Sequence, residues 1–203
     1  RCKLVGFVPG NANQVWNPLA NFLPGAVEEN RKRFGTFTTL YIDINLAEGL
    51  KYRFNAGAEI RSDVYGNFYA SNTTNNLGGP SSSEQQNRLT TNYTLENLLT
   101  YDKSFGKHKL NFTGLYSLQQ SQFQDADYKN SNIAADYLQF YAPQFAANLT
   151  GTGTYQKWDI ISYMARINYG FDNRYMLTLT MRSDGSSRLA PGNKYHVFPS
   201  AAA

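Results

Sequence analysis

Few residues of this sequence could do chemistry, and they do not combine into a catalytic site. His108 and His196 are the only imidazoles that could act as a general base. His108 falls in a predicted tight turn and His196 opens a predicted strand, which favours surface or interface positions for both. No nucleophile elbow, P-loop, zincin helix or paired-cysteine metal site occurs anywhere in the sequence. We therefore predict that the chain is not an enzyme.

One oxygen-rich group could bind a cation. Asp125, Asp127, Asn130 and Asn132 lie close together in a predicted loop, and carboxylate and amide oxygens suit Ca²⁺. The group lacks the glycine and the bidentate glutamate of an EF-hand, so a solvated loop is the favoured interpretation. The single cysteine, Cys2, has no metal-ligand neighbours and cannot form an internal disulfide. We predict no cofactor and no metal, with Ca²⁺ near Asp125 and Asp127 as the disfavoured alternative.

Aromatic side chains are the best candidates for contact with a ligand, because the chain holds 15 Tyr and 13 Phe and several fall in predicted loops. Flat rings there could stack on sugars or peptides. They could equally pack the loops together or sit at a membrane interface. The candidates for substrate contact are Tyr65, Phe68, Tyr69, Tyr128, Tyr137, Phe140 and Tyr141.

Charge and hydropathy exclude two classes of protein. The net charge is +4, but the basic residues are scattered and the densest group is only Arg31-Lys32-Arg33, so nucleic-acid binding is not predicted. No apolar run is long enough for a transmembrane helix. A transmembrane β-barrel stays possible, because each of its strands needs only about 9–11 residues of alternating pattern.

Period-two alternation predicts an all-β chain. In residues 108–119, for example, Leu110, Phe112 and Tyr116 fall on one face, and Asn111 and Thr113 on the other. The same pattern predicts strands over 39–46, 50–61, 92–103, 161–171 and 175–182, and a seventh that begins near residue 196.

The connections between these strands alternate in length. Residues 47–49, 105–107 and 172–173 are hairpin turns, whereas 66–90, 121–157 and 184–194 are predicted loops. Transmembrane barrels place short turns at the periplasmic rim and long loops outside. We therefore predict an antiparallel up-and-down barrel segment. Lys51, Arg53, Glu59 and Arg61 share one face of their strand, which fits a water-filled lumen; a soluble β-sandwich with one polar face stays open.

A resemblance to a known family rests on residues 174–200. The matching residues are Arg182, Asp184, Gly185, Ser186, Ser187 and Arg188, followed by Phe198, Pro199 and Ser200. They closely resemble a stretch of the SusC/RagA family of TonB-dependent outer-membrane transporters. Residues 160–173 look like the strand and turn that precede this motif in the family, and residues 93–110 look like a family hairpin; Leu189 stands where the family pattern has Phe. We interpret the motif as structural: Asp184-Gly185 is a turn signal, and Asp184 can accept hydrogen bonds from Arg182 or Arg188.

The resemblance implies a fold, a location and partners. It implies a barrel of about 22 strands, of which this chain supplies roughly seven, with 1–35 as a loop region and 36–203 as barrel strands and loops. A plug domain and the TonB-contacting segment would precede this chain, whose two ends read as truncations. The implied function is uptake of oligosaccharides or peptides across the outer membrane of a Gram-negative cell. The implied partners are outer-membrane lipid, a SusD-like surface lipoprotein and the TonB complex.

Two rival functions stay open. One is a passive porin-like barrel, and the other is a soluble carbohydrate-binding β-sandwich module; an enzyme with an all-β fold is a third and weaker alternative. We also predict that this segment alone does not fold stably in water, because an open sheet leaves unpaired edges and an exposed apolar face.

Overall fold

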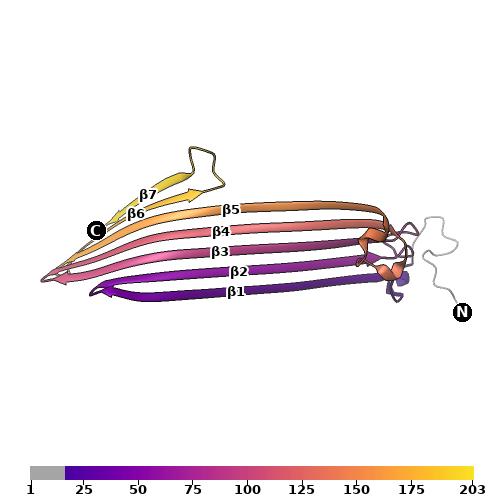
Figure 1. The fold of residues 1–203 in the computed structure, drawn as a ribbon, viewed down its shortest axis with the longest axis horizontal. Helices are drawn as coiled ribbons and strands as arrows, with labels where there is room; N and C mark the ends of the chain where they lie inside the picture. The colour runs from indigo at the N-terminus through magenta and orange to yellow at the C-terminus, as the bar shows by residue number, and fades with distance from the viewer. Residues whose placement is uncertain (1–16) are drawn as a thin grey trace. The chain divides into compact units, whose positions relative to one another are not determined.

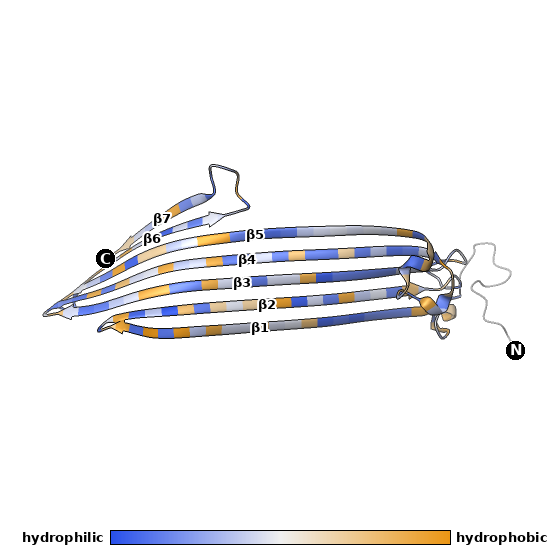
Figure 2. Cartoon of the chain, in the orientation of Figure 1, coloured by the Kyte–Doolittle hydropathy of each residue, from blue (hydrophilic) through white to orange (hydrophobic). Residues whose placement is uncertain are grey.

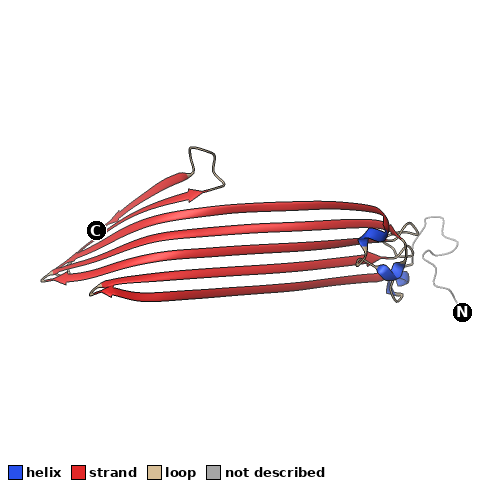
Figure 3. Cartoon of the chain, viewed as in Figure 1, coloured by secondary structure: helices blue, strands red, loops and turns tan. Residues whose placement is uncertain are grey.

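Seven antiparallel strands form one sheet in the computed structural model, which describes residues 17–203. The strands lie in chain order from β1 to β7 (Figures 1 and 3). They are β1 (Val27–Ala47), β2 (Leu50–Tyr69), β3 (Ser82–Phe105), β4 (His108–Ile133), β5 (Ala146–Phe171), β6 (Tyr175–Ser186) and β7 (Tyr195–Ala202). Three short 3₁₀ helices complete the described chain: η1 (Pro18–Phe22), η2 (Asp136–Leu138) and η3 (Pro143–Phe145). None of its helices is both long enough and apolar enough to traverse a bilayer.

The three short turns have backbone conformations that explain their residue types. Gly49 and Gly106 have φ of 77° and 59°, and Asp172 and Asn173 have φ of 51° and 53°. Positive φ at these positions matches the twist of tight hairpins, and Gly, Asn and Asp tolerate it at the lowest cost. The predicted hairpin turns and the seven-strand order are confirmed.

The strands extend well beyond the segments predicted from alternation, which corrects the sequence-based boundaries. β1 begins at Val27, inside the predicted 1–35 loop region. Residues 1–16 of that region lie outside the described residues. The predicted loops 66–90 and 121–157 shrink to 70–81 and 134–145, because β2 to β5 continue into them. The strand extensions carry polar residues on both faces. Their apolar residues therefore do not recur at every second position, although their backbones still pair with the neighbouring strands (Figure 2).

The chain divides into two compact units. Unit 1 comprises residues 17–34, 61–89 and 124–155, and unit 2 comprises 35–60, 90–123 and 156–203. Unit 2 contains the regularly alternating stretches of β1 to β5 together with β6 and β7. Unit 1 contains the strand extensions, the three 3₁₀ helices and the two longer loops.

Unit 2 is a single layer with two unlike faces. On one face Ile167 lies opposite Leu179, Tyr169 lies opposite Leu177, and the ring centroids of Tyr116 and Tyr163 are 5.3 Å apart. We call this the apolar face. Its residues stay exposed in the described chain, with Leu40 57% and Leu179 44% accessible, because no second layer covers them.

The opposite face of unit 2, the polar face, carries a row of hydrogen bonds between strands. Asn168 donates to Asn111 (3.0 Å), Asn111 donates to Asp102 (2.6 Å), and the Thr178 hydroxyl donates to Asn168 (2.9 Å). These bonds join β3, β4, β5 and β6, which shows that the polar residues of four strands lie on one side.

A small hydrophobic core lies in unit 1. Phe68, Ala70, Ile133 and Phe140 are buried together, and Leu138 and Ala146 pack against them. The loop after β4 therefore packs back onto the end of β2. A Cβ atom at Gly66 would overlap the ring of Phe140, so glycine is required for this close approach.

We predict that Gly66→Ala loosens the 134–145 loop in the full-length protein. Overpacking against Phe140 should cost about 1–3 kcal/mol, measured as faster proteolysis within 134–145 in detergent micelles. Gly35→Ala is the matched control, because a Cβ at Gly35 meets no atom within 4 Å. Equal cleavage rates for the two variants would contradict the packing described here.

Candidate functional site

The aromatic residues expected to contact substrate separate into two groups. Phe68 and Phe140 are 0% and 6% exposed and form the core of unit 1, so they pack the loop and offer no surface to a ligand. Tyr137 and Tyr141 are 82% and 66% exposed in the 134–145 loop. Tyr137 and Tyr141 therefore present rings to which a ligand could bind, and Tyr128 is also exposed, at 39%.

The other three candidates of that set lie on strands. The Tyr65 hydroxyl accepts a hydrogen bond from Asn67 (3.0 Å), and the Arg31 guanidinium lies 5.9 Å from the centre of the Tyr65 ring. Tyr69 ends β2 and is partly buried. Tyr128 lies on β4, where its ring packs over Gly151 of β5.

Two arginines share one carboxylate in unit 1. Arg31 binds Asp63 through Nε and Nη2 (3.0 and 2.7 Å), and Arg33 Nε donates to the same carboxylate (3.1 Å). The hydrogen bonds from Arg31 are the largest cause that lowers the pKa of Asp63 below its usual value. The cluster holds two guanidinium groups and one carboxylate, and Glu29 is a further negative charge near Arg31.

The oxygen-rich group predicted as a disfavoured Ca²⁺ site has cationic neighbours. Asp125 accepts a hydrogen bond from Arg88 Nε (3.2 Å), and the Lys129 ammonium lies 3.8 Å from Asp127. Among residues 17–203 no three His, Cys, Asp or Glu side chains converge as metal ligands would.

The two histidines lie on strands. His108 opens β4, so its predicted position inside the turn is wrong by one residue. Its Nδ1 is 2.6 Å from the Tyr169 hydroxyl, and its ring lies 5.0 Å from Phe171 and 5.5 Å from Phe105. His196 lies on β7 opposite Asp184.

Motif residues 182–186 continue β6, so Asp184-Gly185 does not form the predicted turn, and Ser187 and Arg188 begin the connection to β7. Asp184 pairs with His196 and Gly185 pairs with Tyr195, so the strand runs on to Ser186. Gly185 is needed for a different reason from the one predicted: a Cβ there would overlap the Tyr195 ring. The connection to β7 spans residues 187–194, and its positive φ belongs to Gly192 (88°).

The charged groups of the motif bind to neighbouring strands. Arg182 donates to both oxygens of Asp184 (2.9 Å each) and to the Ser162 hydroxyl (3.2 Å), and Ser162 is 1% exposed. Arg188 lies with its guanidinium 5.0 Å from the centre of the Trp158 ring. Arg182 thus holds Asp184, whereas Arg188 stacks on an aromatic ring of β5.

The serines and the second half of the motif also contact neighbours. The Ser187 hydroxyl accepts from the Asp159 backbone N–H (2.8 Å), and Ser186 accepts from the Arg188 backbone (3.3 Å). In β7, Phe198 lies opposite Arg182 and Pro199 lies opposite Met181. These contacts join the motif residues to β5, to β7 or to one another.

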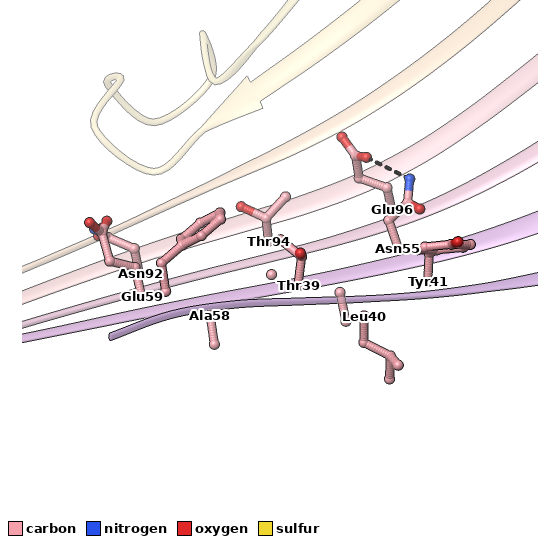
Figure 4. Close-up of a pocket in the computed structure, with 12 residues that line it drawn as sticks. Thr39, Leu40, Tyr41, Asn55, Ala58, Glu59, Asn92, Thr94 and Glu96 are labelled. Atoms are coloured by element: carbon pink, nitrogen blue, oxygen red, sulfur yellow. Dashed lines mark hydrogen bonds between the residues drawn. The ribbon is translucent and has the colours of Figure 1, made fainter. Parts of the chain in front are cut away.

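A groove on the polar face of unit 2 is the feature that sequence reasoning missed. Its volume is about 430 Å³, within the range of small-ligand sites. Its lining residues come from β1, β2 and β3: Phe37, Thr39, Leu40, Tyr41, Asn55, Ala56, Gly57, Ala58, Glu59, Asn92, Thr94 and Glu96. Figure 4 shows Thr39, Tyr41, Thr94 and the Asn and Glu side chains on one side of the sheet, with Leu40 and Ala58 on the other.

Two carboxylate–amide pairs flank the floor of this groove. Asn92 donates to Glu59 (2.8 Å), and Asn55 donates to Glu96 (3.1 Å). β2 supplies the carboxylate of one pair, Glu59, and the amide of the other pair, Asn55. Gly57 lies between the two pairs. A Cβ atom added to Gly57 would lie 3.9 Å from the Cβ atom of Thr94. Only the strand register brings these residues together, so no short motif could have revealed them.

Comparison with known proteins shows relatives of one kind, although no family model matches the chain. The TonB-dependent receptor P3 of Formosa agariphila is 29% identical over 175 residues, which cover 86% of this chain and 18% of that protein. TonB-dependent receptor SusC of Bacteroides thetaiotaomicron is 51% identical over 43 residues, or 21% of this chain and 4% of that protein. The chain thus resembles a part of TonB-dependent receptors.

The solved structures agree with this assignment at the level of the fold. The structure of the RagAB peptide transporter matches with a TM-score of 0.82 at 16% identity, covering 98% of this chain and 22% of that one. A closed state of the RagAB peptide importer matches with a TM-score of 0.80. The chain thus has the fold of part of the RagAB structure. It spans about a fifth of the length of its relatives, 18% in the case of P3.

We predict that Gly185→Ala destabilises the pairing of β6 with β7. The added methyl overlaps the Tyr195 ring, which should cost about 1–3 kcal/mol. The measurement is the unfolding free energy of the full-length protein in detergent or lipid. The double variant Gly185→Ala/Tyr195→Ala should recover most of the loss that Gly185→Ala adds. Strictly additive effects of the two changes would contradict the contact.

Proposed function

We propose that the complete protein is an outer-membrane importer that takes up oligosaccharides or peptides, driven through TonB and assisted by a SusD-like surface lipoprotein. The observation that carries the proposal is the pair of unlike faces of unit 2. One face exposes Leu, Ile and Tyr without a covering layer, and the other carries hydrogen-bonded polar groups. A bilayer outside and water inside would satisfy both faces.

Aromatic residues near the ends of the alternating stretches support a membrane location. Phe105, His108, Tyr169 and Phe171 cluster beside the short turns. Toward the other end of the apolar face, Tyr116 and Tyr163 are in contact. Rings at two levels resemble the aromatic girdles of transmembrane barrels, where amphipathic side chains meet the headgroups.

The length of the strands fits the same proposal. In β2 the apolar alternation runs from Leu50 to Ile60, which is enough for a tilted strand to cross the bilayer. The remainder of β2, with Asp63 and Tyr65, would then stand outside the membrane. Its polar residues on both faces are those expected of strands surrounded by water.

The two rival functions explain fewer of these observations. A soluble sandwich needs a second sheet over the apolar face, and residues 17–203 form one sheet. A passive porin has the same wall, but the relatives are named TonB-dependent receptors, which favours active import. The substrate class includes peptides because the similar RagAB structures are described as a peptide transporter and importer.

We expect an arginine on the apolar face to be far more damaging than one on the polar face. Leu99→Arg would put a charge among lipid chains, at a cost of about 2–4 kcal/mol near the bilayer centre. Thr100→Arg, one residue along β3, would put the same side chain in water. The measurement is the unfolding free energy of the full-length protein in lipid vesicles. Equal costs for the two variants would rule out the assignment of the faces.

Import itself is tested by deleting the gene of the full-length protein. We expect loss of growth on one class of defined glycan or peptide and normal growth on monosaccharides and free amino acids. Complementation with the Thr100→Arg variant should restore growth. Unchanged growth on every polymer tested, with the protein present in the outer membrane of the wild type, would contradict an import role.

A further inference from the structure

A cavity in unit 1 lies where three connecting segments of that unit meet. Its volume is about 510 Å³, within the range of small-ligand sites. Figure 3 shows the three 3₁₀ helices of unit 1 together at one end of the strands, and these helices belong to or adjoin the three segments. We call the cavity the loop pocket. Its lining comes from the 134–145 loop, the start of the 70–81 loop and the segment between η1 and β1, and it includes Asp136, Tyr137, Gln139, Asn72 and residues 23–26.

Contacts elsewhere in unit 1 fix the walls of the loop pocket. Phe140, next to Gln139 in the chain, is buried in the hydrophobic core of the unit. The Gln139 backbone N–H donates to the Asp136 carbonyl (3.1 Å), and the Ala70 N–H donates to the Ala26 carbonyl (2.8 Å). A ligand would therefore meet walls that are already ordered, which lowers the entropic cost of binding.

Tyr137 presents its ring to solvent from this ordered loop. It is 82% exposed, although the next residue, Leu138, packs against the core. A tyrosine ring is apolar on its faces and carries a polar hydroxyl at its edge. It also has few rotatable bonds, so little entropy is lost when it is ordered against a ligand. Such a ring stacks well on a pyranose, because the C–H groups of a pyranose form a flat apolar surface and its hydroxyl groups point outward.

Three polar side chains line the same pocket. Asp136 can accept hydrogen bonds, and the amides of Gln139 and Asn72 can both donate and accept them. Within residues 17–203 none of these three side chains is hydrogen-bonded to another residue, so all three are available to a ligand. Adjacent hydroxyl groups of a sugar, each of them both a donor and an acceptor, match this combination.

The backbone of Gln139 is strained in a way that favours a binding role for its side chain. Its φ is 49° and its ψ is −127°, a conformation in which glycine would be the least strained residue. Residues held in such conformations cluster at ligand sites. Glutamine at this position therefore places an amide in the lining of the loop pocket at a conformational cost that glycine would avoid.

We propose that the loop pocket binds a neutral oligosaccharide, with one sugar ring stacked on Tyr137 and the hydroxyl groups of that sugar hydrogen-bonded to Asp136, Gln139 and Asn72. The inference rests on the proposed function and narrows its substrate class to oligosaccharides. An anionic sugar is disfavoured because the Asp136 carboxylate would repel it. A lysine or arginine side chain of a peptide is disfavoured because it has no acceptor, so the N–H groups of both amides would stay without a partner.

The test is sugar binding by the full-length protein, purified in lauryldimethylamine oxide, a detergent without a sugar headgroup. The protein is applied to a microarray of neutral oligosaccharides (glucans, mannans, galactans, xylans and fructans), uronic-acid oligosaccharides and basic tripeptides. Its affinity for the tightest neutral oligosaccharide is then measured by isothermal titration calorimetry. We expect Tyr137→Ala to weaken this affinity at least about tenfold, and Tyr137→Phe to change it less than about threefold, because a phenylalanine ring still stacks.

The matched control removes a ring from the same loop. Phe145 is 57% exposed and does not line the loop pocket. Phe145→Ala should therefore leave the affinity within about twofold of its wild-type value. Equal losses for Tyr137→Ala and Phe145→Ala would overturn the proposal, because they would reflect only the order of the loop as a whole.

Gln139→Gly separates a binding role from a structural one. The change relieves the strained backbone, so proteolysis within 134–145 should be no faster than in the wild type. The amide is lost, so the affinity for the same oligosaccharide should fall about three- to tenfold. An affinity that Gln139→Gly leaves unchanged or raises would overturn the proposal.

The remaining outcomes distinguish the loop pocket from the import function. Binding of no neutral oligosaccharide, or tighter binding of the uronic-acid oligosaccharides or the basic tripeptides, would overturn the proposal for the loop pocket alone. Absence of the wild-type protein from the outer-membrane fraction would instead contradict the import function, whatever the protein binds on the microarray.

Discussion

Under the proposed outer-membrane location, the structure depends on one constraint: every backbone N–H and C=O group that enters lipid must be hydrogen-bonded within the protein. Seven strands paired in chain order satisfy that constraint along their shared edges. Because side chains alternate between faces, the same ladder separates the apolar from the polar residues of each strand. A shift of one residue between neighbouring strands would reverse this separation, so the fold and the two faces are fixed together.

Hydrogen bonds between side chains of neighbouring strands fix the side chains of the polar face. Asp102, Asn111, Asn168 and Thr178 form a continuous series of hydrogen bonds over β3 to β6. Arg182, in the family motif, extends this pattern by holding both Asp184 and a buried serine of β5. These contacts join β6 to β5 on the polar side of the sheet.

The sequence was sufficient to predict the elements whose two faces meet different solvents. Leu40 to Leu46 and Leu110 to Leu118 alternate because one side needs apolar residues, and both segments lie within observed strands. The strand extensions escaped prediction since polar residues are acceptable on both of their faces. The Asp184-Gly185 pair wrongly predicted a turn. Glycine at position 185 allows a close contact with the Tyr195 ring, and a contact between two strands leaves no pattern in the neighbouring sequence. The Asn–Glu pairs of the groove depend on register and could not be read from spacing along the chain.

The most direct measurement is a nitroxide scan of residues 93–101 of β3 in the full-length protein, reconstituted in lipid bilayers. The collision rates with oxygen and with a water-soluble nickel chelate report lipid and water at each position. The account predicts alternation with a period of two: oxygen at the odd positions, including Tyr93, Leu95 and Leu99, and the nickel chelate at even positions such as Thr94 and Thr100. Low accessibility to oxygen at the odd positions, as in a packed protein interior, would contradict it.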